Sequence, residues 1–263
     1  MEPKRITSLS NPAVKAAAKL KQPRASKEAG CFIVEGARSV EELTGDWETE
    51  SLWVSDTFWG QNHALGWEIA QRLRPSAFCH TPDSILNAIA GTQSPQGILA
   101  VVRRRYFTLQ DVLEHQSTTP LLVILEDLQD PGNAGTILRT ADALDIPVTL
   151  LEGCAAPYSP KTVRASMGAV FRTQPVKADW AEVKAACAEA QIPVAVTALS
   201  RRAKDLRNAD LRGMAVVIGS EGQGVRREIL ESADEELIIP MNKRCESLNA
   251  AVAAAIVMWQ MKQ

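Results

Sequence analysis

Three segments in the second half of the sequence carry polar residues and glycines directly after short apolar, strand-like runs. The first contains Asn133 and Arg139, the second contains Gly219 and Glu221, and the third runs from residue 237 to residue 249 and contains Ser247. A guanidinium stabilises anions, amides and hydroxyls orient ligands, and glycine lets the backbone approach a ligand closely. Since ligands of open α/β sheets bind beyond the carboxyl ends of the strands, these segments are predicted to form one site.

The first segment is predicted to be a turn that leads into a helix. Asn133 and Arg139 lie about 240° apart around a helix, so they converge only if Asn133 lies in the turn. The preceding Pro131-Gly132 favours that placement, and the apolar neighbours of Arg139 predict a buried arginine. A structural alternative stays open, in which Asn133 caps the helix and Arg139 pairs with Asp142.

The second and third segments favour a nucleoside ligand over a bare phosphate. The glycine spacing at 219–224 does not match the dinucleotide-binding fingerprint, and the sequence has no phosphate-loop Gly-Lys-Ser/Thr. Glu221 would repel phosphate, which disfavours a phosphate site. A glycine turn with a purely structural role is an equal alternative to any ligand site here. Ser247 is predicted to cap a helix over residues 247–261 that is apolar on every face, which fits burial against a second subunit or against its own sheet.

The other chemically active residue types exclude several classes of site. The last of the three histidines is His115, so the commonest general base is absent from all three segments. The five cysteines are odd in number and far apart, which predicts reduced thiols and no disulfide framework or metal site. The longest apolar run, residues 250–259, is too short for the about 20 residues of a membrane span, and no leader sequence is recognisable. We therefore expect a cytoplasmic protein with no membrane partner.

The sequence predicts two domains that position these segments. A length of 263 residues and 46% apolar content suit a folded chain of about two domains. Residues 1–106 alternate apolar runs with helical patterns and predict a small α/β domain, and residues 107–119 form a linker. Strands and helices alternate over residues 120–263, which predicts an α/β fold with a mostly parallel sheet and helices on both faces.

The N-terminal segment concentrates positive charge. Residues 1–27 contain seven Lys or Arg residues and one acidic residue, although the whole chain has a formal net charge of −2. Nucleic acid is the leading partner class, and a solvated basic arm is an equal alternative on charge alone. Asn11-Pro12 predicts a helix start. The candidate RNA-binding residues are Lys4, Arg5, Lys15, Lys19 and Arg24.

In this order and spacing, the three segments resemble the SpoU (also called TrmH) family of RNA ribose 2′-O-methyltransferases, in the SPOUT superfamily. Asn133 and Arg139 match its first motif, Glu221 with its glycines matches the second, and Ser247-Leu248-Asn249 matches the third. The N-terminal domain is similar to the family's ribosomal-protein-like substrate-binding domain.

The resemblance implies a trefoil knot in the C-terminal domain, a homodimer through that domain, and methyl transfer from S-adenosylmethionine to a ribose 2′-hydroxyl. The extra N-terminal domain favours ribosomal over transfer RNA. The implied catalytic residues are Arg139, Asn133, Glu221, Ser247 and Asn249. The implied cofactor-binding residues are Leu199, Gly219, Glu221, Ile239, Met241, Ser247 and Leu248.

Two questions stay open at this stage. The family proposal makes Arg139 the activating group, but a guanidinium has a pKa above about 12, so stabilisation of the developing alkoxide is the alternative. The competing function is a non-catalytic RNA-binding or ribosome-associated protein on the same fold. A nucleotide-binding hydrolase is disfavoured because its phosphate-loop, metal and histidine features are missing.

Overall fold

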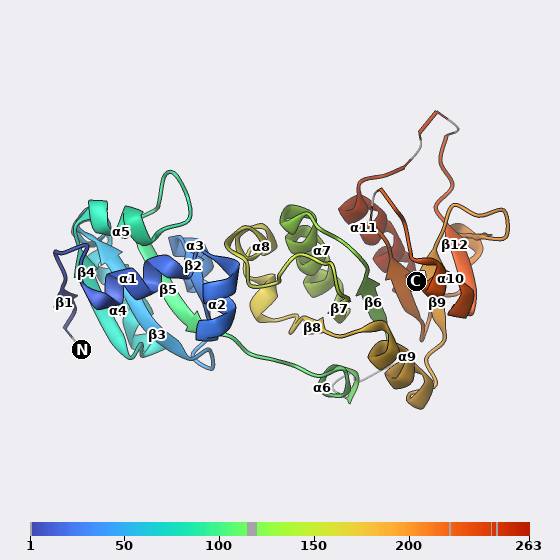
Figure 1. The fold of residues 1–263 in the computed structure, drawn as a ribbon, viewed down its shortest axis with the longest axis horizontal. Coiled ribbons are helices and arrows are strands. Elements are labelled where there is room, and N and C mark those ends of the chain that lie inside the picture. The colour runs from blue at the N-terminus through green and yellow to red at the C-terminus, as the bar shows by residue number, and fades with distance from the viewer. Residues whose placement is uncertain (1, 115–119, 221, 243, 246) are drawn as a thin grey trace. The chain divides into compact units, whose positions relative to one another are not determined.

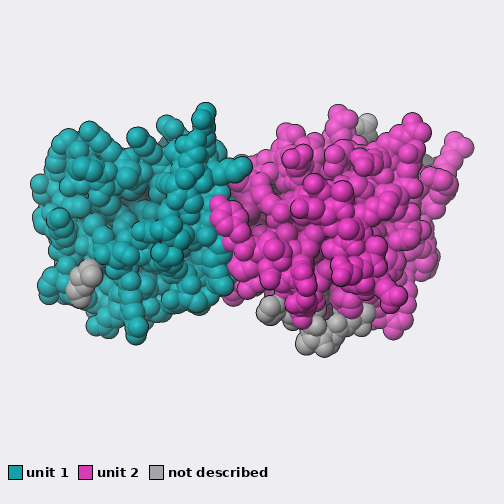
Figure 2. Space-filling view, turned by 60° about the horizontal axis from the view of Figure 1, so that its bottom comes forward, with its two compact units in different colours: residues 1–105, 158–171 teal, residues 106–157, 172–263 magenta. Residues whose placement is uncertain are grey.

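The computed structural model describes residues 2–114, 120–220, 222–242, 244–245 and 247–263. The chain forms two compact units, which Figure 2 distinguishes by colour. Unit 1 comprises residues 1–105 and 158–171, and unit 2 comprises residues 106–157 and 172–263. The segment 158–171, which we place by sequence in the C-terminal domain, therefore belongs with the N-terminal residues.

Unit 1 is built on a five-stranded mixed sheet with the strand order β1-β4-β3-β5-β2 (Figure 1). Strand β5 is antiparallel to both of its neighbours, and β4 is parallel to both of its own. The strands are β1 Lys4–Arg5, β2 Cys31–Glu35, β3 Thr49–Ser55, β4 Ala77–Thr81 and β5 Ile98–Arg103. The helices are α1 Pro12–Lys19, α2 Pro23–Ala29, α3 Ala37–Glu41, α4 Asp56–Leu73, α5 Asp83–Ile89, α8 Pro160–Ser166 and the 3-10 turn η1 Ala169–Phe171.

Aromatic packing explains why the segment 158–171 belongs to unit 1. The rings of Tyr158 and Phe32 stack with centroids 4.7 Å apart, and Phe171 meets Trp47 edge-on at 5.5 Å. All four side chains are buried. Aromatic pairs of this kind stabilise a fold beyond the burial of their apolar surface area, so they hold the segment in this core.

Unit 2 contains a seven-stranded sheet with the order β10-β12-β9-β11-β6-β7-β8. Each neighbouring pair in it is parallel, which confirms the predicted fold class. The strands are β6 Leu122–Leu125, β7 Val148–Leu150, β8 Val176–Lys177, β9 Val194–Thr197, β10 Lys204–Asp205, β11 Ala215–Ile218 and β12 Glu235–Ile238. The helices are α6 Leu109–Glu114, α7 Pro131–Leu144, α9 Trp180–Glu189, α10 Arg227–Ser232 and α11 Ala250–Met261, with the 3-10 turn η2 Leu206–Asn208.

Helices cover both faces of this sheet, as the near-continuous apolar strands predict. Helices α6, α9 and α10 pack on the face that includes Leu122, Ile124 and Val217. The alternate residues Leu125 and Val216 are also fully buried, on the opposite face, where α7 and α11 lie side by side (Figure 1). The trefoil knot that the resemblance implies stays a prediction.

Two helix starts differ from the predicted ones. Helix α7 begins at Pro131 with Asp130 as its N-cap, whose carboxylate accepts a hydrogen bond from the Asn133 backbone at 2.8 Å. Asn133 therefore lies inside the first turn and not before it. Helix α11 begins at Ala250 and is capped by Asn249, so Ser247 lies in the preceding loop.

The predicted linker is partly helical. Helix α6 contributes Leu109 and Val112 to the core of unit 2, so most of the predicted linker segment that the structure describes is a packed element. No helix in the described part of the chain is both long and apolar enough to cross a bilayer. The five cysteines are free thiols and four of them are buried; burial raises the pKa of Cys79 and of Cys187 to about 11.

Candidate functional site

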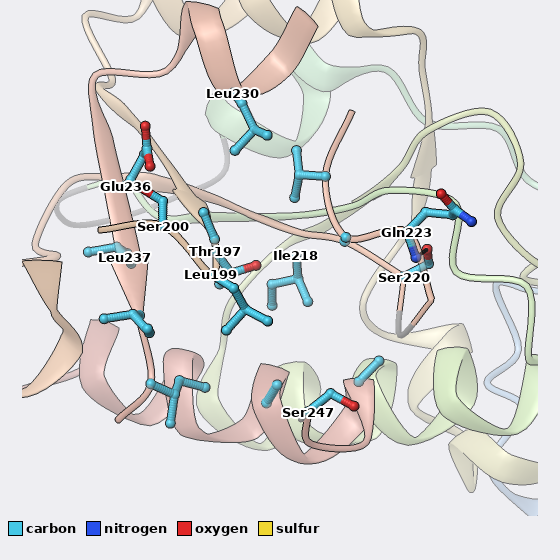
Figure 3. Close-up of a pocket in the computed structure, with 18 of the residues that line it drawn as sticks. Thr197, Leu199, Ser200, Ile218, Ser220, Gln223, Leu230, Glu236, Leu237 and Ser247 are labelled. Carbon is cyan, nitrogen blue, oxygen red and sulfur yellow. Dashed lines mark hydrogen bonds between the residues drawn. The ribbon is translucent and has the colours of Figure 1, made fainter. Parts of the chain in front are cut away.

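A cavity of about 590 Å³ lies at the carboxyl ends of β9, β11 and β12, which are neighbours in the sheet of unit 2 (Figure 3). Its walls are the ends of these three strands, the loops that follow them, one side of α10 and the start of α11. This is the edge where the sequence predicts a ligand, because parallel strands direct all their carboxyl ends to one side.

Six of the seven predicted cofactor-binding residues line this cavity, and they come from three separate loops. The exposed fraction of Leu199 is 73%, so it lies at the mouth of the cavity. Glu221 lies outside the described residues. The role of these residues in cofactor binding stays a prediction. The six are Leu199, Gly219, Ile239, Met241, Ser247 and Leu248.

The cavity walls combine apolar side chains with balanced charges. Arg202 pairs with Glu236 at 2.7 Å, and Arg227 pairs with Glu231 at 2.6 Å. All four of these side chains line the cavity, so its charges are compensated within each pair. A volume of about 590 Å³ falls inside the about 300–1,000 Å³ of small-molecule sites. The site therefore has room for a small molecule and offers it apolar surface beside polar side chains.

Gly219 is required by the loop itself. A Cβ at this position would lie 2.2 Å from the carbonyl carbon of Gly224. The two strands of the loop are joined by backbone hydrogen bonds in both directions between Ser220 and Gly224, at 3.2 and 3.0 Å. The sequence predicts that this glycine lets a ligand approach closely, whereas the structure shows close approach of the chain's own backbone.

The first and third motifs meet through two asparagines. The Nδ2 of Asn249 donates a hydrogen bond to the Oδ1 of Asn133 at 3.0 Å. The Oδ1 of Asn249 accepts from the backbone N–H groups of Ala251 and Val252, at 3.0 and 3.3 Å. The two asparagines line a groove of about 490 Å³ between α7 and α11, not the larger cavity, together with Thr136, Thr140, Ala251, Val252, Ala255, Ile256 and Trp259.

Arg139 is exposed, so the prediction of a buried arginine is wrong. Its neighbours Ile137 and Ala141 are fully buried, and each lies about 200° from Arg139 around the helix. Because Asn133 is helical, its side chain and that of Arg139 do not converge. Arg139 is not among the residues that line the cavity. The alternative ion pair is absent too, because Asp142 pairs with Arg172 at 2.8 Å.

The five predicted RNA-binding residues are all exposed on unit 1. Two of them have acidic partners: Arg5 contacts Asp56 at 2.9 Å, and Arg24 contacts Glu28 at 2.7 Å. The hydrogen bond from Arg5 holds the pKa of the Asp56 carboxyl below its usual value. In the part of the chain that the structure describes, Lys4, Lys15 and Lys19 have no acidic partner, which leaves their charges available to phosphate.

Residues 120–259 match the model of the SpoU rRNA Methylase family, and residues 11–100 match that of the MRM3-like substrate binding domain. The 23S rRNA (guanosine(2553)-2′-O)-methyltransferase RlmP of Bacillus subtilis (strain 168) is 29% identical over 98% of this chain and 99% of that protein. The 23S rRNA (guanosine-2′-O-)-methyltransferase RlmB of Neisseria meningitidis is 33% identical over 66% of this chain and 71% of that protein.

Solved structures agree over the full length. An AdoMet-bound rRNA methyltransferase from Sinorhizobium meliloti has a TM-score of 0.85 and 28% identity, covering 98% of this chain and 97% of that one. The crystal structure of an RNA 2′-O ribose methyltransferase gives a TM-score of 0.80 and 29% identity, covering 98% of both chains.

Proposed function

This chain belongs to the SpoU rRNA methylase family, and we propose that it transfers the methyl group of S-adenosylmethionine to a ribose 2′-hydroxyl of ribosomal RNA. The observation that carries the proposal is the cavity at the ends of β9, β11 and β12, where residues of the second and third motifs come together. Relatives named as 23S rRNA 2′-O-methyltransferases support the substrate class.

The cavity suits the methyl donor. When bound, S-adenosylmethionine supplies an electrophilic methyl group on a positively charged sulfur. The apolar Leu199, Ile218 and Ile239 provide a surface for the nucleoside and exclude water. A water-poor site favours a transfer in which a developing alkoxide meets a positive sulfur, because the charge decreases in the transition state. The Glu236 and Glu231 carboxylates balance the nearby arginines.

Arg139 is proposed to act electrostatically. A guanidinium with a pKa above about 12 is not deprotonated in a protein, so it cannot accept the ribose proton. Its parallel N–H groups can donate to a phosphate next to the target ribose and stabilise the alkoxide. For comparison, one oxyanion-hole donor lowers the activation free energy by about 3 kcal/mol.

Two copies of the chain are proposed to pair through α7 and α11. Val252, Ile256 and Trp259 lie on one side of α11 with exposed fractions of 49%, 39% and 62%, and they line the groove with Asn133. An exposed apolar stripe of this kind is typical of an interface. Arg139 is exposed and does not line the cavity of its own chain, so a second copy over this groove is proposed to place its Arg139 near the site.

A methyl-transfer assay tests the proposal. Purified protein is incubated with labelled S-adenosylmethionine and ribosomal RNA that lacks the modification, and 2′-O-methyl nucleotides are mapped. We expect transfer by the unchanged protein, a loss of at least about 100-fold for Arg139→Ala, and RNA affinity within a few-fold. Arg139→Lys keeps the positive charge but lacks the planar guanidinium. Its methyl-transfer rate is expected to lie between those of the unchanged protein and Arg139→Ala.

Two results would contradict these proposals. Near-normal turnover by Arg139→Ala would remove the proposed role of that residue. Calorimetry that finds no saturable S-adenosylmethionine binding would favour the non-catalytic RNA-binding alternative.

We also propose a cytoplasmic location, which the free cysteines and the ribosomal RNA substrate support.

A further inference from the structure

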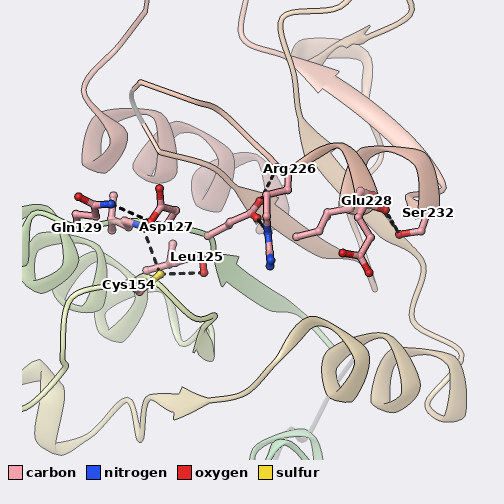
Figure 4. Close-up of polar contacts among 10 residues, drawn as sticks. Leu125, Asp127, Gln129, Cys154, Arg226, Glu228 and Ser232 are labelled. Carbon is pink, nitrogen blue, oxygen red and sulfur yellow. Dashed lines mark hydrogen bonds and ion pairs between the residues drawn. The ribbon is translucent and has the colours of Figure 1, made fainter.

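A buried carboxylate lies beside the glycine-rich loop. Glu126 directly follows β6, and its exposed fraction is only 1%. Its carboxylate accepts a hydrogen bond from the backbone N–H of Arg226 at 2.9 Å and pairs with the Arg226 Nε. Figure 4 shows Arg226 and its polar contacts. Carboxylates are rarely buried unless paired, so this position has a specific partner.

Glu126 holds both ends of the loop that follows β11. The loop leaves the sheet at Ile218, whose carbonyl accepts a hydrogen bond from the Glu126 backbone N–H at 2.9 Å. It ends at Arg226, which the Glu126 side chain binds as described. The loop residues 219, 220 and 222–225 line the cavity, whereas Glu126 does not. One residue outside the cavity therefore sets the separation of the two ends of a loop inside it.

The charge of Glu126 makes this contact sensitive to substitution. The Arg226 side chain is 53% exposed, so it neutralises the buried carboxylate while its outer guanidinium nitrogens stay solvated. Burying a carboxylate is costly unless its partners are in place. Loss of the Arg226 side chain leaves the buried carboxylate with the Arg226 backbone N–H as its bond to this end of the loop, and loss of the Glu126 carboxylate removes both of its side-chain contacts to that end.

We propose that Glu126 is a positioning residue that, with Arg226, holds the loop after β11 in the conformation that binds the methyl donor. This inference rests on the proposed function, because it takes S-adenosylmethionine as the ligand of the cavity. Glu126 acts through the loop and contacts neither the donor nor the ribose.

Glu126→Gln, Glu126→Ala and Arg226→Ala test the proposal. The S-adenosylmethionine Kd is measured by calorimetry well below the unfolding temperature, with RNA affinity and urea unfolding measured in parallel. We expect Glu126→Ala to weaken donor binding by about tenfold or more, with RNA affinity unchanged within twofold. Glu126→Gln keeps an acceptor for the Arg226 N–H and is expected to recover part of that loss.

A second ion pair in unit 2 gives the matched control. Asp142 binds Arg172 through three contacts of 2.8–3.2 Å, away from the cavity. Asp142→Ala also removes an arginine–carboxylate pair, in which the carboxylate side chain is 23% exposed, and is expected to leave the S-adenosylmethionine Kd unchanged. If it weakens donor binding as much as Glu126→Ala does, the effect is general destabilisation and the proposal is wrong.

Hydrogen exchange gives a readout that needs no ligand. The amides of residues 219, 220 and 222–225 are expected to exchange faster in Glu126→Ala and Arg226→Ala, whereas those of α9 stay protected. Unchanged loop exchange and an unchanged donor Kd in both variants would overturn the proposal. If Glu126→Ala does not fold, Glu126→Gln and Arg226→Ala decide. If the unchanged protein does not bind S-adenosylmethionine, the proposed function is wrong. The exchange rates of the loop amides then still test whether Glu126 holds the loop.

Discussion

Both the oxygen and the nitrogen of the Asn249 side-chain amide form hydrogen bonds. Its Oδ1 caps α11 by accepting from two backbone N–H groups, which leaves Nδ2 as the end that faces Asn133. The orientation of the amide is therefore fixed by the helix start and not by the neighbouring side chain alone. A motif residue implied to be catalytic is thus also a helix cap, and its two roles can be separated by substitution.

Asn249→Ala and Asn249→Ser separate these roles. The alanine variant loses the cap and is expected to lower the free energy of unfolding by about 1 kcal/mol, whereas serine, itself a good N-cap, is expected to cost about 0.5 kcal/mol or less. Serine is too short to replace the donor to Asn133, so both variants are expected to lose methyl transfer. Urea unfolding and the transfer assay measure the two effects. Full activity of the serine variant would show that the contact with Asn133 is dispensable.

At the residue scale, sequence predicts which residues lie close together better than it predicts their orientations. The sequence assigns Asn133 and Asn249 to one site without pairing them, and the structure places their side chains in contact. The exposure of Arg139 depends on the rotational phase of α7, and a start at Pro131 turns Asn133 and Arg139 away from each other. Glu126 stands next to four buried strand residues, but its partner is 100 residues away, a pairing that local patterns do not contain.

At the element scale, long apolar runs predict structure well and short edge strands do not. The apolar runs 121–125, 194–198 and 215–219 predict three strands, and β6, β9 and β11 are found within one residue of those ends, because strands covered on both faces are apolar throughout. The edge strands β8 and β10 have two residues each and carry no such signal. Pairing with a neighbour, and not local propensity, defines them.

Two glycines of the same loop allow a matched prediction. A Cβ at Gly219 would lie 2.2 and 2.3 Å from the carbonyl carbon and oxygen of Gly224, whereas one at Gly222 meets no heavy atom within 4 Å. Gly219→Ala must therefore displace backbone, and we expect a loss of more than about 1 kcal/mol in unfolding free energy and weaker donor binding. The free energy of unfolding of Gly222→Ala is expected to lie within about 0.5 kcal/mol of that of the unchanged protein. Equal stability of the two variants would contradict the steric argument.

At the scale of the whole molecule, the sequence predicts two domains but not all of their membership. The change of unit after residue 105 lies next to the predicted end of the N-terminal domain at residue 106. The return of residues 158–171 to unit 1 depends on contacts such as Phe32 with Tyr158, which are separated by more than a hundred residues. Packing at that separation leaves no local pattern, so sequence alone does not reveal it.

The proposed pairing of two copies gives a prediction about assembly. Trp259→Glu places a charge in the groove between α7 and α11 and is expected to convert a dimer into a monomer in sedimentation velocity. Leu9→Glu is the control, because Leu9 is exposed to a similar degree, 57% against 62%, but belongs to unit 1. A dimer that persists in Trp259→Glu would show that this groove is not the interface.

The basic face of α1 makes a prediction about how the molecule holds its RNA. Val14 and Ala17 face the core, and Lys15 and Lys19 are exposed one turn apart without an acidic partner among the described residues. Each lysine that contacts a phosphate releases a counterion on binding, so Lys15→Ala with Lys19→Ala is expected to weaken RNA binding and reduce the slope of log K against log salt by about two. Lys184→Ala, an exposed lysine on α9, is the control and is expected to leave the slope unchanged. The measurement is RNA affinity across a salt series, with the donor Kd unaffected in all variants. An unchanged slope in the double variant would remove α1 from the RNA interface and would leave the positive charge of the N-terminal segment as a solvated arm.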